Sequence, residues 1–206
     1  MTAYEIDGVT PVVDPSAFVH PQACLIGDVV IGPECYIGPF ASLRGDFGRI
    51  EVHAGSNVQD SCTVHVYPGK DTILEERSHI GHGAVLHGCH LEPGILVGMN
   101  SVLMDGVRIG AGSLVAAHSF VRAGSEFPAE SLISGSPAKV VRRLDEQTLA
   151  WKANGAEVYR GLTRRSLETL REVTPLAEEE RNRRRVSTGP ETSIPLHEQR
   201  IPVAGT

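Results

Sequence analysis

The stretch that decides the fold is residues 19–43, VHPQACLIGDVVIGPECYIGPFASL, in which every sixth residue is aliphatic. The pattern continues, with short interruptions, as far as Val121. A period of six fits neither the 3.6-residue turn of a helix nor the two-residue alternation of a lone strand, but it equals three strand periods. Each hexad can therefore form one short strand and a corner, and three hexads can form one coil of a solenoid. The aliphatic positions are Val19, Leu25, Ile31, Ile37, Leu43, Val52, Val58, Val64, Leu74, Ile80, Leu86, Leu91, Val97, Leu103, Ile109, Val115 and Val121.

A second series of small or modest residues lies four places after the first. It comprises Ala23, Val29, Cys35, Ala41, Ser56, Cys62, Ser78, Ala84, Ser101, Val107, Ser113 and Ser119. Large residues stacked coil above coil, with small residues in the tighter positions, predict an all-β fold, a left-handed parallel β-helix over residues 1–140. A β-sandwich would not keep one phase over so many turns.

Two further segments follow the repeat. From Asp145 to Leu170 the apolar spacing becomes helical, and Asp145 is a candidate N-cap, so we expect residues 141–174 to hold a helix packed on the β-helix. Residues 175–206 are polar and contain three prolines beyond Pro175, which predicts a flexible tail.

Composition excludes several classes of protein. The net charge is −6, so no basic footprint for nucleic acid is present. No apolar run is long enough to span a membrane, and the N-terminus lacks the features of a secretory signal. The four cysteines form no CxxC motif, as expected of small apolar residues in a reducing cytoplasm.

Three histidines, His65, His82 and His87, are candidate metal ligands. His65 lies about one coil before His87 once the insertion at residues 66–72 is allowed for, so the two could stack on one face. His82 should diverge from them within one chain but could converge across a subunit boundary, giving a three-nitrogen site with an open position. The alternative for each histidine is a polar surface residue or a hydrogen-bonded filler. We favour that alternative for the other six, His20, His53, His79, His90, His118 and His197.

Two more polar clusters lie close to the phase breaks of the repeat. Arg44 and Asp46 alternate about Gly45, so their side chains should point the same way and could join adjacent subunits. Asn57 and Gln59 alternate likewise about an inward Val58, and their amides could orient a bound water or a substrate carbonyl.

Together these residues resemble a known family. The set Arg44-Gly-Asp46, Asn57-x-Gln59-Asp60, His65 and His82-x4-His87-Gly-Cys89 resembles the γ-class carbonic anhydrase-like hexapeptide-repeat family. Four segments bring it closest to the branch of the phenylacetic acid degradation protein and to the related carnitine-operon protein. These are residues 43–50, Val97-Gly-Met-Asn-Ser101, Met104-Asp-Gly106 and Gly135-Ser-Pro-Ala-Lys139.

The resemblance implies a homotrimer with Zn²⁺, or iron or cobalt in its place, at each subunit interface. His65 and His87 of one chain and His82 of its neighbour would bind the metal. Gln59, assisted by Asn57, would orient the metal-bound water, and Arg44 and Asp46 would form an intersubunit salt bridge. The implied activity is a zinc-dependent thioesterase that releases coenzyme A from ring-modified phenylacetyl-type thioesters.

Three alternatives remain open at this point. A γ-class carbonic anhydrase is disfavoured, because the segment 66–72 is short with Asp71 as its only acid, and Phe47 stands where that class carries an acid. A hexapeptide acyltransferase would bind acyl-coenzyme A between coils. A non-enzymatic trimer could serve as an assembly partner for another enzyme. In the enzymatic cases Tyr159 of the C-terminal helix is a candidate substrate contact.

Overall fold

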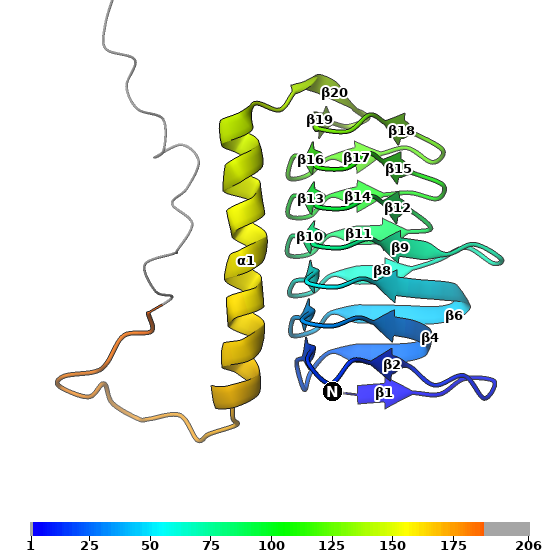
Figure 1. Cartoon of the computed structure of the whole chain (residues 1–206). Coiled ribbons are helices and arrows are strands. Elements are labelled where there is room, and N and C mark those ends of the chain that lie inside the picture. The colour runs from blue at the N-terminus through cyan, green and yellow to red at the C-terminus, as the bar shows by residue number, and fades with distance from the viewer. Residues whose placement is uncertain (1, 188–206) are drawn as a thin grey trace, which may run out of the picture.

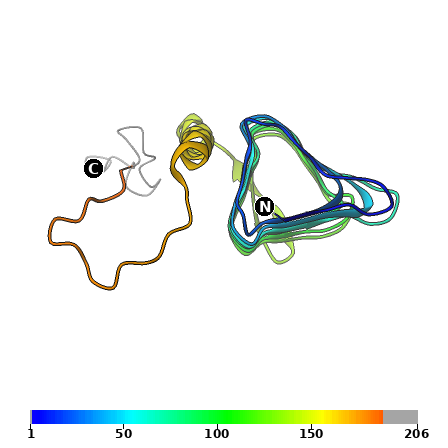
Figure 2. The same cartoon turned by 90° about the horizontal axis from the view of Figure 1, so that it is seen from below.

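The protein is a triangular parallel β-solenoid with one long helix beside it, as the computed structural model shows for the described residues 2–187 (Figure 1). Seen along its axis, the solenoid has three faces joined at corners (Figure 2). Successive coils pair in parallel, and Leu25 pairs with Leu43, three hexads later. The predicted parallel β-helix with a C-terminal helix is confirmed.

Two of the faces belong to one 12-stranded sheet, because β4 (Cys24–Ile31) and β6 (Ser42–Val52) run around a corner and contribute to both. The face built on their first halves also holds β1 (Thr2–Tyr4), β8 (Thr63–His65), β11 (Val85–His87), β14 (Val102–Leu103) and β17 (Phe120–Val121). The face built on their second halves holds β2 (Val12–Val13), β9 (Thr72–Leu74), β12 (His90–Leu91), β15 (Arg108–Ile109) and β18 (Glu126–Phe127).

The third face is a separate 8-stranded sheet. It holds β3 (Phe18–Val19), β5 (Tyr36–Ile37), β7 (Asn57–Val58), β10 (His79–Ile80), β13 (Leu96–Val97), β16 (Leu114–Val115), β19 (Ser131–Gly135) and β20 (Ala138–Arg143). All of its neighbours pair in parallel except β19 and β20, which form an antiparallel hairpin at the end of the solenoid. The third face is the one that the helix covers.

The interior of the triangle is filled by the residues of the six-residue repeat. All of the predicted aliphatic positions except Val19 are buried, and Val19 is partly buried against the same core. The predicted small positions are buried as well. Side chains stack in columns, one of which is Leu25, Leu43, Val64, Leu86, Leu103 and Val121. Each coil therefore buries its apolar side chains against its neighbours.

The predicted phase breaks widen one corner of the triangle. β6 continues as a strand through Gly48, and the segment between β8 and β9 projects as a loop (Figure 1). The loop crosses β6 so closely that a Cβ atom on Gly48 would lie 1.9 Å from the carbonyl oxygen of Lys70. Glycine is required here because any side chain would collide with backbone.

Helix α1 (Glu146–Thr169) returns along the third face of the solenoid (Figure 1). It begins at Asp145, whose Oδ1 accepts a hydrogen bond from the backbone N–H of Thr148 at 2.8 Å, so the expected N-cap is present. α1 lies within the range predicted to be helical.

The predicted tail, residues 175–206, has no helix or strand over 175–187, and the remainder lies outside the described residues. No helix in the described part of the chain combines the length and apolarity that a bilayer requires.

Candidate functional site

The centre of the candidate site is a pair of histidine rings on neighbouring coils. β8 and β11 are parallel partners, and their register sets His65 directly beside His87. Nδ1 of His65 lies 3.1 Å from Nε2 of His87, and the ring centroids are 5.1 Å apart. The structure therefore brings together the two histidines that the coil spacing predicts to stack.

A carboxylate holds the outer nitrogen of each ring. Nε2 of His65 lies 2.9 Å from Oδ1 of Asp46, and Nδ1 of His87 lies 2.6 Å from Oδ1 of Asp105. Since an ionised carboxylate can only accept hydrogen bonds, both outer nitrogens carry a proton in this arrangement. The two inner nitrogens of neutral rings then face each other with lone pairs, so the pair is suited to share a proton or to bind a cation.

Arg44 supports the pair through Asp46. Nη1 of Arg44 lies 2.5 Å from Oδ2 of Asp46, so both side chains of β6 point to one side, as their alternation about Gly45 predicts. Burial by itself would raise the pKa of Asp46, but the hydrogen bonds from Arg44 and His65 and the charge of Arg44 lower it on balance. Asp46 therefore stays ionised beside His65. The role of Arg44 and Asp46 between subunits stays a prediction.

Two residues of the site, Asp105 and Phe47, were not among the predicted site residues. Asp105 follows His87 by three hexads, so extending the stacking rule by one coil would have found it. Phe47 lies at the corner after Asp46, with its ring centroid 5.3 Å from that of His65 and about half of the residue exposed. It gives the histidine pair an apolar border.

His82 lies away from this pair. It precedes β11 whereas His87 ends it, and Nδ1 of His82 lies 2.5 Å from Oδ2 of Asp60, with both side chains exposed. Within residues 2–187 of one chain, no three or more His, Cys, Asp or Glu side chains are arranged to hold a metal ion. Convergence of His82 on the pair of a neighbouring chain stays a prediction.

Gln59 and Asn57 belong to a different cluster, on the third face. Nε2 of Gln59 lies 3.0 Å from Oδ1 of Asn57 and 2.8 Å from Nε2 of His79, a residue that we interpreted as a filler. Val58 points inward, as predicted. Tyr159 of α1 packs edge-on against His79, with the centroids 5.1 Å apart, and burial raises the pKa of its hydroxyl. In a single chain these amides therefore face His79 and α1.

A hollow of about 310 Å³ lies next to the histidine pair, under the loop between β8 and β9. Gly88 and Gly106, the residues that follow His87 and Asp105, form part of its wall. Lys70 and Arg108 line it as well, together with Asp71. The hollow is thus lined by the cationic residues Lys70 and Arg108, one coil or less from the His65 and His87 rings.

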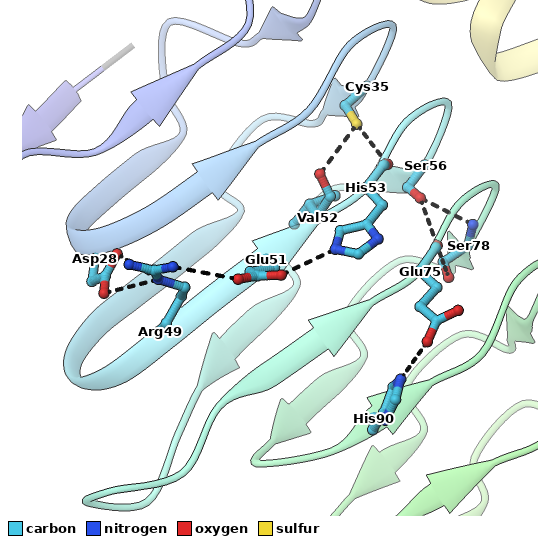
Figure 3. A network of polar contacts seen from close by, with 10 residues as sticks. All are labelled: Asp28, Cys35, Arg49, Glu51, Val52, His53, Ser56, Glu75, Ser78 and His90. Atoms are coloured by element: carbon cyan, nitrogen blue, oxygen red, sulfur yellow. Dashed lines mark hydrogen bonds and ion pairs between the residues drawn. The ribbon is translucent and has the colours of Figure 1, made fainter.

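Other histidine–carboxylate pairs lie on the face of β6, β9 and β12. Figure 3 shows His53 beside Glu51, with 3.1 Å between Nε2 and Oε2, and His90 beside Glu75 at 2.6 Å. Each of these pairs contains one histidine, and neither ring stacks on a second histidine within residues 2–187. Pairing with a carboxylate is therefore common in this chain, and the feature particular to the candidate site is the stacked pair of rings.

Solved structures of transferases share this architecture. A hexapeptide transferase family protein from Anaplasma phagocytophilum is 37% identical, with a TM-score of 0.77 over 79% of this chain and 96% of that one. A Bacillus cereus protein with a provisional acetyltransferase assignment is 33% identical, with a TM-score of 0.78 over 79% and 94%. A scan against protein-family models finds no match.

These findings correct the main functional prediction. The zinc-dependent thioesterase acting on ring-modified phenylacetyl-type thioesters is contradicted, because the similar structures are named as transferases. The geometry gives the physical reason. The metal of such an enzyme needs three protein ligands, with an amide to orient its bound water. The two histidines expected from one chain do meet, but in that chain Gln59 contacts His79 and not the histidine pair. The acyltransferase alternative fits the comparisons better.

Curated relatives match nearly the whole chain. The carnitine operon protein CaiE of Proteus sp. is 53% identical over 186 residues, which cover 90% of this chain and 94% of the relative. The same protein of Escherichia coli K12 is 51% identical over 90% of this chain and 95% of the relative. These names bear out the carnitine-operon part of the resemblance and leave the carbonic anhydrase-like and phenylacetate parts unsupported. The chain belongs to the hexapeptide-repeat family of the carnitine operon protein CaiE.

Proposed function

We propose that the protein is an acyltransferase that moves an acyl group from a coenzyme A thioester to a nucleophilic acceptor. The observation that carries the proposal is the stacked pair of His65 and His87, held from outside by Asp46 and Asp105. Such an imidazole–carboxylate arrangement serves as a general base in many group transfers. The transferase names of two structures above 30% identity support it.

The proposed mechanism uses the inner nitrogens of the pair. The acceptor's hydroxyl or amine attacks the thioester carbonyl, and its proton moves to the lone pair of His87 or His65. The new C–O or C–N bond replaces the C–S bond, and the coenzyme A thiolate leaves and takes up that proton. Asp46 and Asp105 stabilise the positive charge that the rings carry between these two steps.

The hollow beside the histidine pair is the proposed binding site of the acyl-coenzyme A donor. Phosphate groups are bound by cationic side chains, and Lys70 and Arg108 supply two of them at this wall. Phe47, exposed at the border of the pair, offers apolar surface to the acyl or pantetheine portion. Because the relatives are named for a carnitine operon, thioesters of carnitine-derived acids come first in the donor panel.

The test is thiol release from a panel of acyl-coenzyme A donors, measured with and without amine and hydroxyl acceptors. We expect release to depend on an acceptor and an acylated product to appear by mass spectrometry. In the variant His87→Asn the rate should fall about a hundredfold or more, the usual loss when a general base is removed.

The matched control is His53→Asn, which removes a histidine of another carboxylate pair, on the face shown in Figure 3. It should transfer at the wild-type rate. Equal losses in both variants would contradict the role of the histidine pair. Absence of transfer for every donor and acceptor would overturn the acyltransferase proposal and favour a non-enzymatic partner role.

We propose metal binding as the alternative use of the same inner nitrogens: His65 and His87 of one chain, with His82 of a neighbouring chain, would hold zinc, or iron or cobalt in its place. In the metal-bound protein these nitrogens would not act as the general base. The carboxylates on the outer nitrogens support this, since they fix the tautomer that a metal requires. A bound metal would supply Lewis-acid activation of a carbonyl.

Elemental analysis of the purified protein tests the metal proposal. One metal per chain, lost in His65→Ala, is expected, and metal-free wild-type protein that takes up no added zinc would contradict it.

A further inference from the structure

A second cavity lies between α1 and the third face of the solenoid, away from the histidine pair. Its volume is about 300 Å³. Its floor is formed by β10 and by the turns that precede β10, β13 and β16, and its roof by the first half of α1. It is lined by Arg77, His79, Pro93, Gly94, Ile95, Gly112, Leu149, Lys152, Ala153 and Ala156. Its wall therefore combines basic and aliphatic side chains.

Lys152 is the unusual member of this wall. It is only 7% exposed, and its Nζ donates a hydrogen bond to the carbonyl oxygen of Gly94. The described residues that line the cavity include no acidic side chain. Burial, and then the charge of Arg77, lower the pKa of Lys152 to about 8, so the ammonium remains mostly charged at neutral pH. A buried charge without a counter-ion is costly, and an anion in the cavity would remove that cost.

The surroundings of Lys152 narrow the choice of anion. Arg77 brings a second cation to the wall, although its own Nη2 pairs with Glu157 at 3.0 Å. Burial holds the pKa of His79 near 4, so this ring is neutral and adds no charge. The rest of the wall is aliphatic, with Ile95 and Leu149 among its larger members. One strongly placed cation beside an apolar wall suits a monoanion with a hydrocarbon chain better than a multiply charged phosphate.

We propose that this cavity binds a short-chain aliphatic carboxylate, with its carboxylate at Lys152 and its chain against Ile95 and Leu149. The ligand would tie α1 to the coils beneath it. The proposal is independent of the acyltransferase function, because the cavity lies under the helix and shares no lining residue with the hollow beside the histidine pair.

The experiment is isothermal titration calorimetry of the full chain with acetate, butyrate and hexanoate. Butyramide is the uncharged isostere of butyrate, and inorganic phosphate is the general anion. The single tryptophan, Trp151, precedes Lys152 and gives a second readout through its fluorescence. We expect saturable binding of butyrate, stronger than that of acetate, and no binding of butyramide. Phosphate that binds as tightly as butyrate would overturn the carboxylate assignment.

Variants separate the site from nonspecific binding. Lys152→Met should weaken butyrate binding at least tenfold, while Lys139→Met, at an exposed position of β20, should leave it unchanged. If Lys152→Met misfolds by circular dichroism, Ala153→Leu keeps the ammonium and narrows the cavity, and should weaken hexanoate more than acetate. Wild-type protein that binds no carboxylate, or equal affinity in folded Lys152→Met, would overturn the proposal.

Discussion

At the scale of single residues, the neighbours of each histidine ring decide its chemistry. His65 and His87 have carboxylates on their outer nitrogens, whereas His79 has amide nitrogens near both of its own, at 3.3 Å from Asn57 and 2.8 Å from Gln59. Coil spacing in the sequence predicted the stacking of the first two rings. It did not predict the burial of His79, because α1, far along the chain, covers this ring. A contact between such distant segments leaves no mark on the local sequence pattern.

The first prediction concerns acid stability and His79. Its pKa is about 4 in the folded protein against 6.5 for the free side chain, so the unfolded chain takes up this proton first as the pH falls. The free energy of unfolding that depends on the neutral His79 ring is fully present above pH 6.5. It falls by up to roughly 3 kcal/mol as the pH drops toward 4. His79→Gln should therefore lose less unfolding free energy than wild type between pH 7 and pH 5 in urea titrations. Parallel losses in the two proteins would contradict this account.

The second prediction concerns the buried ammonium of Lys152. Because its pKa is lowered from 10.5 to about 8, the folded state is penalised at neutral pH, and the penalty is relieved as the pH rises from 8 to 10.5. Lys152→Met keeps most of the packing and removes the charge, at the loss of one hydrogen bond to Gly94. We expect about 1–2 kcal/mol of added stability at pH 7 by urea unfolding. A less stable variant at that pH would show that the ammonium is already neutralised.

At the scale of elements, some of the chain's glycines mark where two segments approach too closely for a side chain, and others do not. Gly48 lies under the backbone of Lys70 where the loop between β8 and β9 crosses β6, whereas a Cβ atom added to Gly155 in α1 would meet no neighbouring atom within 4 Å. The sequence showed a phase break at the first position. It could not show the crossing, which depends on where the inserted segment folds back.

The third prediction compares these two glycines. Gly48→Ala should destabilise the protein by about 1–3 kcal/mol, since the new Cβ must displace backbone. Gly155→Ala should stabilise it by about 0.5–1 kcal/mol, because alanine is the better helix former. Thermal unfolding of both variants against wild type measures the difference, and two shifts of the same sign would contradict it.

At the scale of the whole molecule, the sequence predicted the fold far better than the function. Stacked columns such as Leu25, Leu43 and Val64 reflect a purely local period, so the periodicity alone was sufficient to predict the solenoid. The reaction depends on which side chains meet between coils and between chains, and one fold hosts many chemistries. The presence of His65, His82 and His87 was visible in the sequence. The separation of His82 from the other two in one chain was predicted as well, and the thioesterase prediction failed because the similar solved structures with this fold are named as transferases.

The fourth prediction concerns assembly. Completion of the proposed metal site needs His82 of a neighbouring chain, so we expect a homotrimer, with a mass three times the 22.1 kDa of one chain. Light scattering coupled to size-exclusion chromatography measures it directly. His82→Ala should reduce metal content and leave the mass unchanged, because one histidine is a small part of a subunit interface. A wild-type mass of a single chain would contradict the shared site.

The helix beside the solenoid also acts as a ruler. Its 24 residues span about 36 Å, the height of about seven coils at roughly 4.8 Å each. It is fastened to the coils at several heights, by Arg160 to Glu34 and by Lys152 to Gly94. Duplication of one 18-residue coil within the spanned region would therefore leave the helix about three residues too short. A solenoid that gains a coil by duplication therefore also needs a longer α1. A descendant with an added coil should carry a compensating insertion in this helix.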